Sequence, residues 1–307
     1  MDIRHPRTNH EFKIRNNLLQ NSLRPENLPF DIQSEYPIIL NEASAETSYC
    51  MFDANNNIVA HASLWKRPVI NNTRDCIDHI GLIGNVATSE EFRGKGLMSQ
   101  LLNYLEMQAL EYQLSCLILW SDLGKFYQKL GYESLGKEQR IFLRTPHSDT
   151  LATYNPAFHI DINPHLKEKE LDLLLLLRKQ TDYTLNRSAK EFDRLLRIPN
   201  CDLFTIQQDG RIVAYAIVGK GYDMMGVIHE WGYIVEEAMS YLINVIIKGL
   251  NLNQILILAP LATNLDFIGL EVIERQIHPM AWARFLGTAN SAHIYKDNLF
   301  IWGLDSI

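Results

Sequence analysis

The segment Asn85–Leu97 constrains the fold more than any other part of the chain, because its glycine-rich loop lies between a strand pattern and a helix pattern. Before the loop, a short apolar run is typical of a buried strand, with Ile80, Leu82, Ile83 and Val86 as its members. The basic, glycine-rich run Arg93–Gly96 then predicts a turn. After the turn, apolar residues recur at helical spacing, at Leu97, Met98, Leu101, Leu102 and Leu105. The pattern predicts a strand that ends in a glycine-rich loop and continues directly into an amphipathic helix.

This loop is a candidate anion site, because backbone N–H groups at a helix N-terminus attract negative charge. Gly94 and Gly96 would let a phosphate approach the backbone, and Arg93 and Lys95 would add positive charge. Two common phosphate loops do not fit: Gly96 is not followed by Lys-Ser/Thr, and the dinucleotide fingerprint needs a third glycine. Taken alone, a solvated basic turn at a helix start remains the alternative.

A second motif follows about thirty residues downstream, where the strand-like run Leu117–Trp120 precedes Phe126-Tyr-Gln-Lys-Leu-Gly-Tyr-Glu133. The two motifs together resemble the GNAT superfamily of acyl-CoA-dependent N-acyltransferases. Its cofactor motif, Arg/Gln-x-x-Gly-x-Gly/Ala, is followed one strand later by Phe-Tyr-x-x-Leu-Gly-Phe/Tyr. The resemblance extends from about Tyr49 to Arg144. Met98 departs from the pattern, because Gly or Ala is usual there, and this helix start would pack less closely on the cofactor.

The resemblance implies how acetyl-CoA would bind. The pantetheine arm would pair with the edge of the strand before the loop, as an added strand does. The N–H groups of Arg93–Gly96 would hold the pyrophosphate. The implied cofactor-binding residues are Val86, Ala87, Thr88, Arg93, Gly94, Lys95, Gly96, Leu97 and Met98. Transfer would be direct and without a metal, because no cysteine lies within the motifs as a nucleophile and the four cysteines have no metal-type spacing.

Three residues are candidates for the proton transfers. The resemblance implies that Tyr127 is the general acid for the leaving thiolate; a tyrosine packed in the core is the alternative. His79, on the strand before the loop, has a suitable ordinary pKa for a base, but a structural histidine fits the same pattern. Asp122 could contact a cationic acceptor, although a helix cap formed by Ser121 or Asp122 is favoured.

The apolar run Phe300–Ile307 suggests one more hypothesis. In one group of tandem-GNAT aminoglycoside acetyltransferases, the terminal carboxylate reaches the N-terminal active site and acts as the base. A last sheet strand is the favoured alternative for this run.

The chain contains one hairpin pattern twice. Residues 53–62 and 207–216 each combine an Asn/Asp/Gly-rich turn with Ile-Val-Ala-x-Ala. Similar elements are expected after each copy. After the first copy we expect strand 77–87, helix 96–113, strand 116–120 and helix 124–130. After the second copy we expect strand 226–235, helix 236–249, strand 254–259, a helical segment near 263–275 and strands near 279–286 and 293–302. Helices are also expected at 10–22, 166–180 and 188–197.

We therefore predict an α+β (three-layer α/β) protein of two tandem GNAT-like domains, 1–148 and 149–307, each a mixed, mainly antiparallel sheet flanked by helices. The Pro-containing stretch 145–164 is the expected linker. At the cofactor loop position, the second copy has one glycine, no Arg or Lys, and the carboxylates Glu236 and Glu237. Because carboxylates would repel a pyrophosphate, we expect no cofactor site in the second domain.

Composition narrows the class of protein. With 47% apolar and 21% charged residues, the chain is an ordinary globular protein, and its net charge of −7 argues against nucleic-acid binding. The longest apolar runs are too short to span a bilayer, so we expect a cytoplasmic protein that does not act at a membrane. We also expect the protein to be a monomer or a homodimer.

The predicted function is transfer of the acetyl group of acetyl-CoA to a primary amine of a small molecule or peptide. The alternatives are an acyl-CoA-binding sensor without turnover and a protein acetyltransferase whose second domain docks a macromolecule. By resemblance, the segments 22–48 and 67–77 would determine the acceptor.

Overall fold

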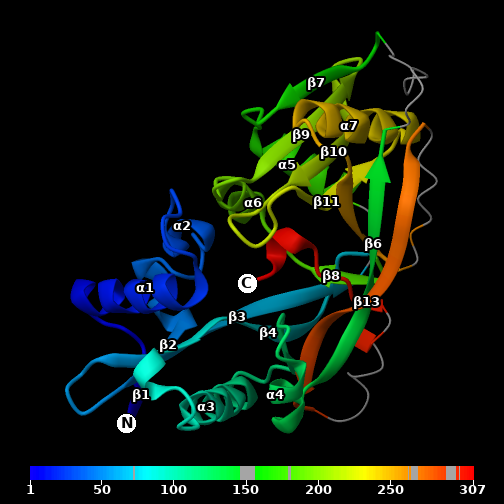
Figure 1. The fold of residues 1–307 in the computed structure, drawn as a ribbon. Coiled ribbons are helices and arrows are strands. Elements are labelled where there is room, and N and C mark those ends of the chain that lie inside the picture. Colours follow the sequence, from blue (N-terminus) through cyan, green and yellow to red (C-terminus); the bar gives the residue numbers. More distant parts are fainter. Residues whose placement is uncertain are drawn as a thin grey trace.

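The computed structural model (Figure 1) describes residues 1–71, 73–145, 156–178, 181–261, 263, 269–287, 295–296 and 298–307. The strands are β1 (Asp2–Arg4), β2 (Ser48–Phe52), β3 (Ile58–Asn71), β4 (Cys76–Thr88), β5 (Cys116–Leu119), β6 (Glu133–Arg144), β7 (His159–Ile162), β8 (Tyr183–Leu185), β9 (Asp202–Gln208), β10 (Arg211–Val218), β11 (Val227–Tyr233), β12 (Ile255–Pro260) and β13 (Glu271–Phe285). The α-helices are α1 (Asn9–Leu23), α2 (Ile32–Glu35), α3 (Leu97–Glu111), α4 (Gly124–Lys129), α5 (Glu168–Leu177), α6 (Ala189–Leu195) and α7 (Glu236–Gly249). Short 3₁₀ turns are η1 (Glu42–Thr47), η2 (Glu90–Phe92) and η3 (Gly303–Asp305).

One mixed sheet runs through both halves of the chain, which we call the first half (residues 1–145) and the second half (residues 156–307). In the described residues its order is β1-β2-β3-β4-β5-β13-β6-β12-β11-β10-β9-β7, with β8 paired to β3. Most neighbours are antiparallel; β4 pairs parallel with β5, and β11 pairs parallel with β12. The chain is thus a mixed, mainly antiparallel sheet flanked by helices, as its sequence predicts.

The two halves exchange one strand each. β13, from the second half, pairs with β5, placing Trp282 opposite Leu119. β6, from the first half, pairs with β12, placing Leu143 opposite Ile255. β6 and β13 also pair with each other and run side by side between the halves (Figure 1). Each half therefore completes the sheet of the other.

The duplicated hairpin is present at both expected positions. β2 and β3 are joined through Asn56 (φ 61°), and β9 and β10 through Asp209 (φ 51°) and Gly210 (φ 72°). These left-handed conformations suit tight hairpin turns and explain the turn composition that repeats in the sequence.

The helices pack on the sheet through their apolar faces. α1 and α3 lie on opposite sides of the first-half strands (Figure 1). α3 buries the predicted stripe, consisting of Leu97, Leu101, Leu102, Leu105 and Ala109. Successive residues of β4 serve the two faces: Leu82 joins one buried cluster and Ile83 the other.

Three local predictions are wrong. The expected helix 263–275 overlaps β13, because residues from Glu271 onward pair with β6, and this tertiary pairing outweighs the local pattern; residues 262 and 264–268 lie outside the described residues. In the expected strand 293–302, Tyr295 and Lys296 are helical, while residues 293–294 and 297 lie outside the description. The last segment forms η3 rather than a strand. Within the expected linker, residues 146–155 lie outside the description, and His159–Ile162 form β7.

Candidate active site

β4 and β5 separate at the centre of the first half. Their pairing in the described residues ends at Leu82 opposite Ile118, after which β4 continues to Thr88 and β5 stops at Leu119. Asn85, with φ of 48°, lies where the pairing of β4 with β3 shifts register. A cavity of about 780 Å³ lies at this gap and is lined by residues 83–88 of β4. The separation leaves the β5-facing edge of β4 open to a ligand.

The glycine-rich loop adjoins this cavity. Gly94 (φ 75°) and Gly96 (φ 76°) adopt left-handed conformations, and a Cβ at either would meet no atom within 4 Å. The glycines are therefore needed for the turn, and the space above them is open. In the described part of the chain, the amides of residues 94–99 donate no hydrogen bond, and Gly96 caps α3. These free amides at a helix N-terminus fit the pyrophosphate of an acyl-CoA.

One detail of the expected anion site is wrong. The Arg93 amide donates to the Glu90 carbonyl at 3.2 Å, so the free amides begin at Gly94 rather than at Arg93. The Arg93 side chain is exposed, and its Nε donates to the Thr88 carbonyl at 3.2 Å. Lys95 is also exposed, with Nζ 4.7 Å from the centre of the Phe92 ring. Both cations lie at the loop, as expected, and Met98 and Leu97 line the adjoining space.

Tyr127, on α4, lines the cavity and is only 4% exposed. Its ring packs edge-on against Phe126 and Tyr132. Burial raises the pKa of Tyr127, and this outweighs the lowering effect of Ser121. The phenol therefore keeps its proton at neutral pH, which a general acid requires.

The second half supports the helix that carries Tyr127. Trp282 of β13 donates its indole N–H to the Ser121 carbonyl at 3.0 Å. Its ring fills the space beside Gly124, where a Cβ would lie 2.3 Å from a ring carbon. Ser121 Oγ accepts from the Leu123 amide at 3.0 Å and so shapes the start of α4. Sequence reasoning missed Trp282, because its role depends on the strand exchange.

The opposite wall of the cavity comes from both halves, from the ends of α1 and α2 and from the turn after β10. These residues are Ser22, Leu23, Arg24, Glu35, Tyr36, Lys220, Asp223 and Met224. Arg24 joins the two contributions: Nε lies 2.5 Å from Glu35 Oε1, and Nη2 lies 2.9 Å from Asp223 Oδ2. Tyr36 donates to the same Asp223 oxygen at 2.9 Å. The expected acceptor segment 22–48 thus contributes, whereas no described residue of 67–77 lines this cavity.

Ser306 and Ile307 also line the cavity. Ile307 packs directly on β4, because a Cβ at Gly84 would lie 2.5 Å from its carbonyl carbon. This placement favours the hypothesis that the last residues of the sequence reach the site in the first half, over the expected strand.

The other two catalytic candidates lie outside the cavity. His79 is exposed near the start of β4, six residues and about 20 Å of strand from Asn85. Asp122 is exposed and does not line the cavity, although Ser121 and Leu123 do. Of the three candidates, the structure brings only Tyr127 to the cavity. Among the described residues, no group of three or more His, Cys, Asp or Glu is arranged to hold a metal ion.

The corresponding position of the second half is closed. Beyond its parallel pairing with β12, β11 forms a bridge from Gly232 to Arg178, which follows α5. The approach is so close that a Cβ at Gly232 would lie 2.1 Å from the Leu177 carbonyl oxygen. The chain therefore fills the space that β4 leaves open, and Glu236 and Glu237 begin α7 in place of a basic loop.

Comparisons with known proteins agree with this geometry. Residues 16–132 match the family model described as Acetyltransferase (GNAT) family. No curated protein matches the chain. Among the described residues, no helix has the length and apolar character that crossing a bilayer requires.

Solved structures share the fold over nearly the whole chain. An Enterococcus faecalis V583 protein described as a probable N-acyltransferase has a TM-score of 0.67 at 17% identity, over 93% of this chain and 73% of that one. A GCN5-related N-acetyltransferase from Anabaena variabilis has a TM-score of 0.65 at 12% identity, over 94% and 74%. One from Kribbella flavida has a TM-score of 0.62 at 13% identity, over 93% and 71%. Residues 16–132, which carry the loop and Tyr127, therefore match the GNAT family of acetyltransferases, and nearly the whole chain shares its fold with these structures.

Proposed function

We propose that the protein transfers the acetyl group of acetyl-CoA to a primary amine of a small molecule or peptide, at one active site in its first half. The observation that carries this proposal is the continuity of one cavity. It joins the open edge of β4, the start of the loop with free amides, and the buried phenol of Tyr127. The bridge between Gly232 and Arg178 supports a second half without a cofactor site.

Each part of the cavity has a role in binding acetyl-CoA. The backbone of Val86–Thr88 would pair with the pantetheine amides as an additional strand. The amides of residues 94–99 and the α3 dipole would hold the pyrophosphate, with Arg93 and Lys95 nearby. Acetyl-CoA supplies an activated thioester, and binding both reactants in one cavity would lower the entropic part of the barrier.

The reaction needs two proton transfers. The amine nitrogen attacks the thioester carbonyl carbon, the C–N bond forms, and the C–S bond breaks. Tyr127 would donate its phenolic proton to the leaving thiolate. A base must take a proton from the amine, and neither His79 nor Asp122 lines the cavity. In a chain that ends at Ile307, the carboxylate there lies against Gly84 and is the candidate base.

Calorimetric titration with acetyl-CoA tests the proposed cofactor site. We expect one site per chain, and Gly96→Asp should weaken binding at least about 100-fold, because a carboxylate would enter the open space above the loop. Gly210→Asp is the matched control, because Gly210 is also exposed and left-handed (φ 72°) and a Cβ there would meet no atom within 4 Å. Absence of binding to the unaltered protein would refute both the enzyme and the sensor hypotheses.

Turnover then separates these two hypotheses. Thiol release is measured with spermidine, tyramine, lysine methyl ester and a tetrapeptide with a free N-terminus. Acetylation of any of these amines that is lost in Tyr127→Phe supports the enzyme. Tight binding of acetyl-CoA without thiol release with any of them favours the sensor.

A further inference from the structure

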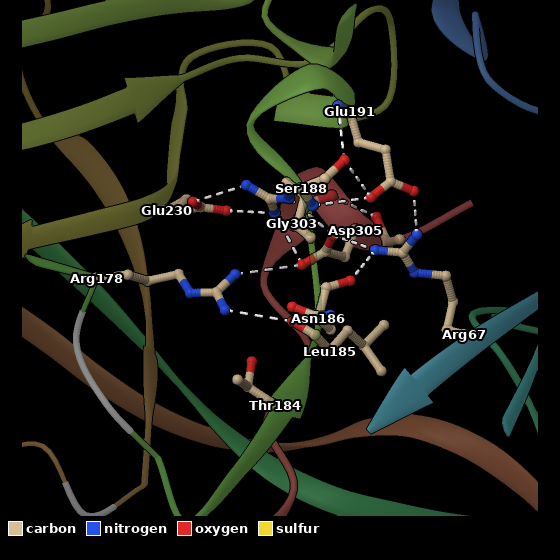
Figure 2. Close-up of polar contacts among 12 residues, drawn as sticks. Arg67, Arg178, Thr184, Leu185, Asn186, Ser188, Glu191, Glu230, Gly303 and Asp305 are labelled. Atoms are coloured by element: carbon tan, nitrogen blue, oxygen red, sulfur yellow. Dashed lines mark hydrogen bonds and ion pairs between the residues drawn. The ribbon is translucent and has the colours of Figure 1, made fainter. Parts of the chain in front are cut away.

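The segment Gly303–Ile307, which we call the η3 segment, is held in place by the buried side chain of Asp305 and ends in the cavity. Asp305 is 0% exposed and lies among arginines from both halves (Figure 2). Ser306 and Ile307, the next two residues, line the cavity. A buried carboxylate in this position needs paired cations, because burying a lone charge is costly.

The cations around Asp305 come from three places in the chain. Asp305 Oδ1 accepts from Arg187 Nε at 2.9 Å, and Oδ2 lies 2.7 Å from Arg187 Nη2. Arg178 Nη1 lies 3.5 Å from Oδ2, and Arg67 Nη2, from β3, lies 3.7 Å from Oδ1. Both carboxylate oxygens therefore have partners, and one partner belongs to the first half.

The cluster is balanced in charge. Its members are Arg67, Arg178, Arg187, Glu191, Glu230 and Asp305. Arg187 also binds both oxygens of Glu230, at 2.9 and 2.8 Å, and Arg67 Nη1 lies 2.6 Å from Glu191. Burial alone would raise the pKa of Asp305, but the arginines outweigh burial and hold it below its ordinary value. Asp305 thus stays ionised and fixed between the halves.

A second anchor acts on the residues on either side of Asp305. Lys220, in the turn after β10, is 7% exposed and lines the cavity. Its Nζ donates to the Gly303 carbonyl at 2.8 Å, to Ser306 Oγ at 3.2 Å and to the Ser306 carbonyl. These three bonds use all three donors of the ammonium group. All the hydrogen bonds that this buried lysine can donate therefore go to the η3 segment.

Building on the proposed function, we propose that Asp305 and Lys220 are positioning residues for the acceptor side of the active site. Both act through the η3 segment, which they hold against β4 at Gly84. The second half thereby completes a site whose cofactor elements lie in the first half. Loosening either anchor would widen the acceptor wall and leave the loop at residues 94–99 intact.

Lys220→Met tests the positioning, because it keeps the length of the side chain and removes the donors. Lys190→Met, at an exposed position on α6, is the matched control, and Lys220→Arg restores a cation with donors. Hydrogen exchange is followed for a peptide covering residues 299–307, where the amides of Asp305 and Ser306 are bonded to carbonyls at 2.9 and 3.2 Å. We expect at least about tenfold faster exchange in Lys220→Met and none of this change in the control.

Kinetics and binding complete the test. The kinetics are measured with whichever of the four amines has the highest kcat/KM. In Lys220→Met, the KM for this amine should rise at least about tenfold, while the Kd for acetyl-CoA should stay within about twofold. Lys220→Arg should recover part of the lost affinity for the amine. Unchanged exchange would overturn the positioning, and faster exchange with unchanged amine kinetics would overturn its role at the acceptor side. If the unaltered protein did not bind acetyl-CoA, the proposed function would fail while the exchange result still decided the positioning.

Discussion

The substitution Asp305→Asn would test whether the buried cluster needs equal numbers of positive and negative charges. The substitution removes one of three carboxylates and leaves three arginines around the site. Asp305, Arg187 and Glu230 are fully buried, so water cannot compensate the excess positive charge. Breaking a buried ion pair from one side costs about 3–5 kcal/mol. We therefore expect a loss of unfolding free energy of this order.

The corresponding change in melting temperature follows from the size of the chain. An unfolding entropy of about 2.1 cal/mol/K per residue gives roughly 0.65 kcal/mol/K for this chain. If both halves unfold together, as their exchanged strands require, Asp305→Asn should lower the Tm by about 5–8 °C. Scanning calorimetry at neutral pH measures this shift, and a single transition checks the cooperative unfolding.

A double variant separates charge from packing. The Arg178 guanidinium contacts Asp305 and the Leu185 carbonyl, so adding Arg178→Met to Asp305→Asn restores the charge balance at the cost of one weaker contact. We expect the double variant to be more stable than the sum of the two single losses by at least about 1 kcal/mol. Additive losses, or a Tm shift below about 2 °C for Asp305→Asn, would refute the electrostatic reasoning.

Three further predictions concern other parts of the molecule. Tyr127→Phe should lower kcat about 10²–10⁴-fold with an unchanged acetyl-CoA Kd; a change below twofold in stopped-flow turnover would remove the acid role. Gly84→Ala should displace Ile307 and lower kcat/KM for the amine about 10–100-fold, since overpacking costs about 1–3 kcal/mol, and unchanged kinetics would show that the contact is unimportant. Burial lowers the pKa of His61 to about 3 and that of His229 to about 4, so below pH 6.5 the unfolded chain takes up protons that the folded chain does not. The free energy of unfolding should therefore fall as the pH drops from 6.5 towards 4.5, by about 1.4 kcal/mol per pH unit for each histidine. Urea unfolding measures this slope. If the slope persisted in a variant with both histidines changed to Gln, the reasoning would be contradicted.

Local patterns in the sequence predict the elements that build the cofactor side of the site. The alternation in β4, the two glycines of the loop and the apolar stripe of α3 all act within about 35 residues of one another, so short-range spacing reveals them. The repeated hairpin follows from turn residues whose left-handed conformation is a local requirement. Spacing does not reveal that the Arg93 amide is occupied, because its bond to the Glu90 carbonyl depends on the geometry of η2.

The acceptor side depends on contacts between distant segments. Trp282 reaches Ser121, and Lys220 reaches Ser306, through strand exchange and the buried cluster. Periodicity shows only whether a residue faces a core, and for the start of β13 it favours a helix. The sequence predicts the strand that carries His79, but the distance of His79 from the cavity depends on where β4 and β5 separate, which no local pattern specifies.

The strand exchange has a consequence for synthesis on the ribosome. β5 is complete roughly 150 residues before β13, its partner on the free edge, is made. At about 5–20 residues per second, the apolar run Cys116–Leu119 remains without that neighbour for about 8–30 s. During this interval the nascent first half has an open apolar edge that can pair with other chains. A version truncated after β6 would keep this edge permanently, so we expect it to aggregate even though it contains every predicted cofactor-binding residue.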